Sequence, residues 1–163
     1  MRMIDAIDTS ILKILQSNAR TSNAEIARQV GLAPSAVFER LRKLEERGVI
    51  RGYSVNLDPR AMEVPLVCFI FVRSSERVGS PTTAASLAEI PEVLEIHHVA
   101  GEDCFLLKVR AADTEAVGRL LREKFGKIPS ITSTRTTIVL ETVKETAALP
   151  IPAVEEEPEA RSA

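Results

Sequence analysis

Apolar side chains in the first 60 residues recur every three or four positions, which is the spacing of one face of an α-helix. Five branched residues make the first apolar stripe: Ile4, Ile7, Ile11, Ile14 and Leu15. This stripe predicts a helix over roughly residues 5–17. A later apolar stripe, made of Val37, Leu41 and Leu44, predicts another helix, which starts near Pro34 and ends at Gly48.

Between these two helices, the chain carries start and stop signals for a shorter one. Ser22 and Glu25 have the spacing of a capping box, and Gly31 has the position of a C-terminal cap. Residues 31–33 then form a short glycine-containing turn, so the three helices predict a helix-turn-helix. Residues 49–57, VIRGYSVNL, are rich in β-formers and predict a strand that leads into a linker at Asp58 and Pro59.

After Pro65 the apolar pattern changes to that of alternating strands and helices. Strands are expected at 66–72, 93–100, 104–110 and 131–142, with helices at 80–90 and after an Asp113 cap. The order β-α-β-β-α-β predicts a ferredoxin-like domain, and the whole chain an α+β protein. We expect domains at 1–60 and 61–146, followed by a disordered acidic tail at 147–163.

The strand predicted at 66–72, LVCFIFV, is apolar on both of its faces. One face holds Leu66, Cys68, Ile70 and Val72, and the other holds Val67, Phe69 and Phe71. Helices of a ferredoxin-like domain cover only one face of the sheet. The second face therefore predicts a homodimer in which two sheets pack together.

Charge is distributed unevenly along the 163 residues. The chain as a whole has 21 Lys+Arg and 23 Asp+Glu, a net charge of −2. Residues 1–60 hold ten basic and seven acidic residues, whereas residues 61–163 hold eleven and sixteen. This asymmetry is compatible with a nucleic-acid partner for the first domain. No apolar run is long enough for a membrane span, and Cys68 and Cys104 form no CxxC motif, so we expect a reduced, cytoplasmic protein.

The outer face of the third helix supplies the candidate contacts with double-stranded DNA. Ser35 and Arg40 have the chemistry to bind base edges, since Arg can bind guanine through two hydrogen bonds. Glu39 is open to two interpretations, selection of cytosine or an ion pair with Lys43. The full set of DNA-binding candidates is Arg20, Arg28, Ser35, Ala36, Glu39, Arg40, Arg42, Lys43 and Arg47. A solvated basic face stabilised by salt bridges is the alternative.

Three segments of the chain carry a family resemblance: residues 4–59, HVAGEDCFLLKVR (98–110) and STRTTIVLETVKE (133–145). The first resembles the DNA-binding domain of the Lrp/AsnC (feast/famine) transcriptional regulators, and the other two resemble the effector-sensing domain of that family. The resemblance implies a winged helix-turn-helix at about 23–42 and a linker strand at 50–57. It also implies dimers that stack into octamers or similar rings, with an amino acid or related small molecule bound between dimers.

The resemblance also implies effector-binding residues, and here the sequence departs from the family. Many relatives carry Gly-Asp-x-Asp-Tyr where this chain has Gly101, Glu102, Asp103, Cys104 and Phe105. Cys104 replaces the second Asp, a natural partner for an ammonium group, and Asp103 lies one position earlier. Thr134 and Thr136 match positions that line the family's pocket. The alternative is that residues 101–103 form only a hairpin turn.

Other chemistry is sparse along the chain. His97 and His98 are adjacent on a predicted strand and point to opposite faces, so we expect no metal site. No catalytic motif is present, and we expect neither an enzyme nor a cofactor. The leading hypothesis is a sequence-specific transcriptional regulator that responds to an amino acid. The alternatives are an architectural DNA-organising protein without an effector and a metabolite-binding accessory subunit.

Overall fold

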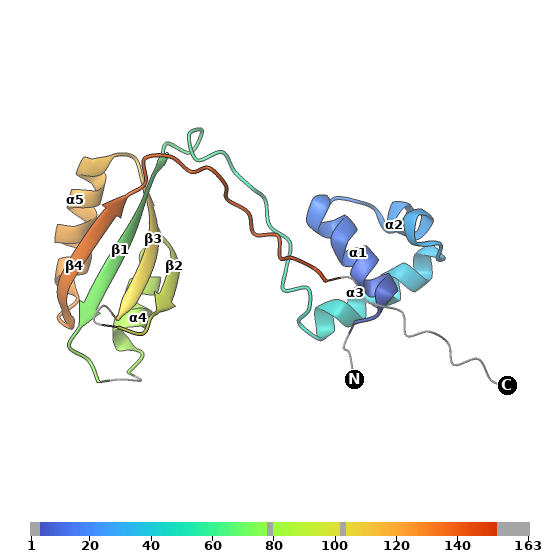
Figure 1. Ribbon diagram of the computed structural model, residues 1–163, viewed down its shortest axis with the longest axis horizontal. Helices are drawn as coiled ribbons and strands as arrows, with labels where there is room; N and C mark the ends of the chain where they lie inside the picture. Colours follow the sequence, from blue (N-terminus) through green and yellow to red (C-terminus); the bar gives the residue numbers. More distant parts are fainter. Residues whose placement is uncertain (1–3, 78–79, 102–103, 153–163) are drawn as a thin grey trace. The chain divides into compact units, whose positions relative to one another are not determined.

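The computed structural model describes residues 4–77, 80–101 and 104–152 and is shown in Figure 1. Its contacts divide the chain into two units. One unit contains the residues up to Val55 together with the segment that starts at Glu145, and the other contains Asn56–Lys144. Each unit has its own buried apolar core.

The first unit is a helix-turn-helix of three helices, α1 (Ala6–Ser17), α2 (Asn23–Val30) and α3 (Pro34–Glu46). Its core contains one side chain from α1 and two each from α2 and α3: Ile11, Ile26, Ala27, Val37 and Leu41. Ile11, Val37 and Leu41 belong to the apolar stripes that the helical spacing predicted. The apolar stripes and the burial agree because side chains three and four positions apart lie on the same side of a helix.

Capping differs from the sequence expectation at two helix starts. A complete capping box lies at α1, where the Asp5 carboxylate accepts the Asp8 N–H (2.7 Å) and the Asp8 carboxylate accepts the Asp5 N–H (3.3 Å). At α2, the Ser22 hydroxyl accepts the Glu25 N–H (3.2 Å), but the Glu25 carboxylate binds Arg28. The expected box at α2 is therefore half-formed.

The prediction of a strand at 49–57 is wrong, because residues 49–65 contain no strand. Tyr53, Val55 and Leu57 are exposed large apolar residues of this segment. A strand requires a neighbouring backbone to accept and donate its ladder hydrogen bonds. High β-propensity without such a neighbour leaves the segment outside any sheet.

The second unit has the ferredoxin-like order predicted from sequence. Its elements are β1 (Leu66–Ser74), α4 (Thr82–Ala88), β2 (Val93–His98), β3 (Phe105–Ala111), α5 (Thr114–Glu123), a 3-10 turn (Phe125–Lys127) and β4 (Ile131–Ile138). The strands form one antiparallel sheet in the order β2-β3-β1-β4, with β1 between β3 and β4.

Three elements of this unit, β2, α4 and β4, are shorter than expected. The strand expected at 131–142 ends at Ile138, which pairs with Cys68 near the start of β1. Only Val139 adds one more hydrogen bond, to the Val67 carbonyl (3.0 Å), because β1 begins at Leu66. Helix α4 begins after Pro81 without a side-chain cap.

The two faces of β1 have different environments. Cys68, Ile70 and Val72 are fully buried in one cluster with side chains of α4 and α5, so both helices cover this face. On the other face, Phe69 and Phe71 are half-buried, and the Arg135 guanidinium lies 3.9 Å from the centre of the Phe71 ring. The uncovered face remains apolar at its centre.

The chain beyond β4 belongs to the first unit from Glu145 onward. Residues 139–152 contain no helix or strand. The Leu149 N–H donates to the Gln16 side-chain carbonyl (2.7 Å), and the Leu149 carbonyl accepts from the Gln16 amide nitrogen (3.3 Å). Of the tail predicted to be disordered, residues 147–152 belong to this segment, and residues 153–163 lie outside the described residues.

Gly31 provides a test of the turn between α2 and α3. Its φ is 72°, in the left-handed region, and a Cβ there would meet no atom within 4 Å. We expect Gly31→Ala to lower the free energy of unfolding by about 1–2 kcal/mol, because only backbone strain is added. The measurement is urea unfolding followed by far-UV circular dichroism.

Gly118→Ala is the matched control, since Gly118 lies inside α5 and its added Cβ would meet only the mobile end of Arg122. It is expected to raise the free energy of unfolding by roughly 0.5–1 kcal/mol. Equal effects of the two substitutions would contradict a strained turn.

Candidate nucleic-acid interface and ligand site

The exposed pole of α3 lies opposite its buried residues Val37, Leu41 and Leu44. Four exposed side chains mark this pole: Ser35, Glu39, Arg42 and Glu46. Arg42 forms ion pairs with Glu39 (3.1 Å) and with Glu46. Glu39 therefore pairs with Arg42, and the pair with Lys43 that the spacing offered is not the one formed.

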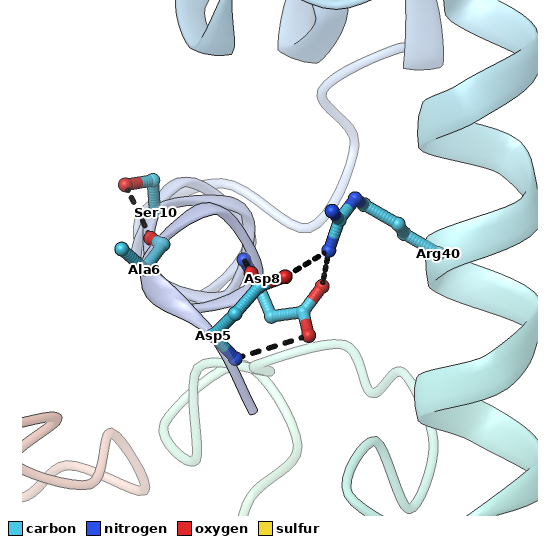
Figure 2. Close-up of polar contacts among 5 residues, drawn as sticks. All are labelled: Asp5, Ala6, Asp8, Ser10 and Arg40. Carbon is cyan, nitrogen blue, oxygen red and sulfur yellow. Dashed lines mark hydrogen bonds and ion pairs between the residues drawn. The ribbon is translucent and has the colours of Figure 1, made fainter. Parts of the chain in front are cut away.

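Arg40, the second expected base reader, points away from this pole. Figure 2 shows its side chain directed from α3 to the start of α1, where Nη1 lies 2.6 Å from Asp5 Oδ2 and 2.7 Å from Asp8 Oδ1. Its side chain is 30% exposed. The guanidinium is thus bound within the protein, whereas Ser35 is exposed at the N-terminal end of α3.

The remaining basic candidates are all exposed. Lys43 and Arg47 lie on one flank of α3, on the helical stripe that also contains Ala36 and Arg40. On α2, Arg28 donates two hydrogen bonds to Glu25 (3.0 and 2.7 Å), and this interaction raises the pKa of Arg28. Arg20 follows α1, and its backbone N–H is bound by Asn18 (3.0 Å).

Phe38 is a candidate that the sequence interpretation did not include. It lies on α3 three residues after Ser35, and its side chain is 55% exposed. Its place outside the stripe of Val37, Leu41 and Leu44 was the available signal. An exposed aromatic ring near the start of a recognition helix can contact the methyl group of thymine.

The described ligand-site candidates lie at one end of the sheet. The Cys104 N–H donates to the Val72 carbonyl (2.9 Å), and Thr134 pairs with Val72 from the opposite side, in β4. Cys104 and Thr134 are therefore about 10 Å apart, two strand spacings across β1. Thr136 pairs with Ile70, two residues further along the sheet, and Gly101 is exposed. Glu102 and Asp103 lie outside the described residues.

A hollow of about 230 Å³ adjoins this end of the sheet. Its lining contains Cys104 and seven residues that were not predicted: Ser74, Glu76, Arg77, Ser80, Ala84, His98 and Phe105. Thr134 and Thr136 do not line it. Glu76 and Arg77 supply opposite charges, which match the ammonium and carboxylate of an amino acid. No spacing signal in the loop before α4 identified these residues.

Hydrogen bonds hold two of the residues that line this hollow, Ser74 and Glu76. The fully buried Thr83 hydroxyl lies 3.0 Å from the Ser74 hydroxyl and 2.7 Å from that of Ser130. The Glu76 carboxylate accepts the Thr83 N–H (3.0 Å) at the start of α4, and this bond lowers the pKa of Glu76. The charged form of Glu76 is therefore favoured in the hollow that Cys104 also lines.

A larger hollow of about 420 Å³ lies at the opposite end of the sheet. Arg60 and Arg110 line it together with Asp58 and Glu141, but no predicted ligand-binding residue does. By size alone, this hollow is the better candidate for a ligand site. The smaller hollow is the better candidate by position, because Cys104, one of the expected ligand-binding residues, lines it.

Neither a metal cluster nor a membrane helix is present in the part of the chain that the structure describes. Within that part, no group of three His, Cys, Asp or Glu side chains is arranged to hold a metal ion. No described helix is long and apolar enough to cross a membrane.

Two family models match the chain. A winged helix-turn-helix DNA-binding model covers residues 4–51, and the Lrp/AsnC ligand binding domain covers residues 67–149. The chain is 38% identical over 148 residues to an HTH-type transcriptional regulator of Pyrococcus horikoshii, across 91% of this chain and 97% of the relative. It is 36% identical over 152 residues to the leucine-responsive regulatory protein of Salmonella typhimurium, across 91% and 92%.

Solved structures give the same similarity. The crystal structure of a transcriptional regulator of Neisseria meningitidis in complex with L-methionine matches with a TM-score of 0.84. The two chains are 31% identical, and the match covers 91% of this chain and 97% of the other.

The pKa of Asp5 links acid stability to the contact between α1 and α3. Burial raises this pKa, but the hydrogen bond from the Asp8 N–H and the ion pair with Arg40 outweigh burial, so the pKa lies below its ordinary value. A carboxyl group with a lowered pKa stabilises the folded state above its unfolded pKa. This contribution is lost as pH falls through the folded pKa.

We therefore expect the free energy of unfolding to fall below about pH 4 more steeply in the wild type than in Asp5→Asn. Asn retains an acceptor at the helix start but does not titrate. Urea unfolding at several pH values between about 6 and 3 measures this difference. Parallel pH profiles of the two proteins would rule out a contribution from Asp5.

Proposed function

The chain belongs to the Lrp/AsnC family of transcriptional regulators, and we propose that α3 reads DNA while an amino acid bound at the Cys104 end of the sheet alters DNA affinity or assembly. The observation that carries the first part is the arrangement of α2, the turn at Gly31 and α3, with Ser35, Lys43 and Arg47 exposed on α3. In a helix-turn-helix the second helix enters the major groove.

The contacts with DNA are divided by position along α3. Ser35, Ala36 and Phe38 lie in its first turns, which reach the base edges in this docking geometry. Lys43 and Arg47 lie further along and bind phosphates, while Arg20 and Arg28 hold the backbone beside α2. Arg42 reaches a phosphate by exchanging its exposed pairs with Glu39 and Glu46, which costs little because such pairs contribute only about 0–1 kcal/mol.

Self-association supports tight binding. A domain with a small basic excess gains affinity when two or more copies bind one DNA molecule. The uncovered sheet face supplies the contact surface, with Phe69 and Phe71 at its centre and Leu106 beside them on β3. We propose a dimer formed through this face, and an octamer or similar assembly of dimers, acting in the cytoplasm.

The proposed ligand is a free amino acid. The relative of Neisseria meningitidis binds L-methionine, and the hollow beside Cys104 offers Arg77 for a carboxylate and Glu76 for an ammonium group. The family resemblance adds Gly101, Glu102, Asp103, Thr134 and Thr136 to this site. Thr134 and Thr136 do not line the hollow, so their contribution requires a ligand that extends across β1 or a neighbouring subunit.

Removal of Lys43 and Arg47 tests the phosphate contacts. Each phosphate contact contributes about 0.9 to the slope of log K against log salt concentration. We expect Lys43→Ala/Arg47→Ala to reduce the slope by roughly 2 and to weaken binding to all sequences alike. Fluorescence anisotropy on labelled duplexes at several salt concentrations measures the DNA affinity and its salt slope. Lys127→Ala, an exposed lysine of the other unit, is the control. An unchanged slope would remove α3 from the DNA interface and favour the accessory-subunit alternative.

Titration with each of the twenty amino acids tests ligand control. With L-methionine first among them, we expect at least one to change the DNA affinity or the sedimentation coefficient of the wild type. Cys104→Asp is expected to tighten amino-acid binding by about tenfold, because it adds a charged acceptor for the ammonium group. Cys104→Ser is the uncharged control. If no amino acid changes either property, the architectural alternative replaces ligand control.

A further inference from the structure

We propose that Arg40 is a positioning residue, which holds α3 against the start of α1 so that the base-reading side chains of α3 enter the major groove at a fixed angle. The inference rests on the proposed function of α3 as the DNA-reading helix. On the sequence pattern alone, Arg40 lies on the outer face of the third helix and is expected to contact a base. The role proposed here is a different one.

The geometry joins three side chains, Asp5, Asp8 and Arg40, which we call the acid clamp (Figure 2). One oxygen of each aspartate belongs to the capping box, because Asp5 Oδ1 accepts the Asp8 N–H and Asp8 Oδ2 accepts the Asp5 N–H. The other two oxygens, Asp5 Oδ2 and Asp8 Oδ1, both accept from Arg40 Nη1, at 2.6 and 2.7 Å. The two carboxylates therefore begin α1 and bind α3 at the same time.

Burial makes this contact difficult to exchange. The side chain of Asp8 is only 12% exposed, whereas those of Arg40 and Asp5 are 30% and 53% exposed. A mostly buried carboxylate that loses its cation is strongly unfavourable. Arg40 cannot move to a base without leaving Asp8 in that state, so the protein retains Arg40 at α1. By contrast, Arg42 is 47% exposed and its partners Glu39 and Glu46 are 53% and 57% exposed, so these pairs exchange more readily.

The clamp supplies an orientation that the apolar core does not. Ile11, Val37 and Leu41 pack α1 and α3 into one cluster, but apolar burial is not directional. Two short hydrogen bonds from one nitrogen restrict how α3 slides and rotates against α1. Arg40 lies roughly 7.5 Å along the helix from Ser35 and about 10 Å from Arg47, so it anchors α3 between its base-reading and phosphate-binding ends.

The test compares three variants on two DNA duplexes. One duplex is a site enriched from random sequences by the wild-type protein, and the other is a scrambled sequence of the same composition. The variants are Arg40→Met, Asp5→Asn/Asp8→Asn, and the triple combination. Asn keeps the acceptors of the capping box and removes the charges. The measured quantity is the specificity ratio, the affinity for the selected site divided by that for the scrambled duplex.

We expect Arg40→Met and the double Asn variant each to lower the specificity ratio by about tenfold, the effect of roughly one mismatched base pair. The triple variant should be no worse than either, because the residues act through one contact. Arg40→Lys should restore part of the ratio. The salt slope on scrambled DNA should stay that of the wild type, since no phosphate contact is lost.

Several outcomes would overturn the proposal. Arg40→Met with an unchanged specificity ratio would show that the clamp does not position α3. If Arg40→Met reduces affinity equally in the wild-type and double Asn backgrounds and lowers the salt slope by about 0.9, Arg40 contacts DNA directly. If the double Asn variant raises the specificity ratio, Arg40 reads a base once it is released, and Asp5 and Asp8 normally prevent that contact.

Controls separate folding from positioning. Thermal unfolding by circular dichroism checks each variant, and the double and triple variants keep the test valid if Arg40→Met does not fold, because they leave no unpaired carboxylate. Arg119→Met, which breaks an exposed pair with Glu115 on α5 (3.2 Å), should leave the ratio unchanged. If the wild type enriches no site from random DNA, the proposed function fails. If a site is enriched and the variants behave additively, only the positioning role fails.

Discussion

The central strand β1 is apolar on both faces, and α4 and α5 cover only one of them. Cys68, Ile70 and Val72 are buried beneath these helices, whereas Phe69 and Phe71 remain half-buried on the other face. A second sheet that packs there removes this apolar surface from water. In our account this packing joins two copies of the chain, and the paired helix-turn-helix units compensate for the small basic excess of each.

Two polar arrangements connect this framework to function. In the helical unit, Asp5 and Asp8 link the start of α1 to Arg40 of α3, so the fold of one helix determines the position of the other. In the sheet unit, Thr83 and Glu76 link the start of α4 to the hollow beside Cys104. Each site is thus supported by the residues that begin a helix, where backbone N–H groups lack partners within the helix.

Sequence patterns predicted the elements in which burial follows a regular period. The stripe of Val37, Leu41 and Leu44 and the order of strands both agree with the structure. The strand at 49–57 failed because β-propensity does not supply a pairing partner. The acid clamp was also missed, since Arg40 lies 35 residues from Asp5 and its place on the helix resembled that of an exposed reader. Such pairings depend on tertiary structure, and local spacing does not encode them.

Selection of bound sites from random duplex DNA, followed by sequencing, tests the central claim that α3 reads DNA within a symmetric assembly. The account predicts an enriched inverted repeat whose half-sites lie about one helical turn, or a multiple of it, apart. Enrichment of a single half-site would contradict the symmetric assembly. Recovery of random sequences without enrichment would contradict base reading by α3.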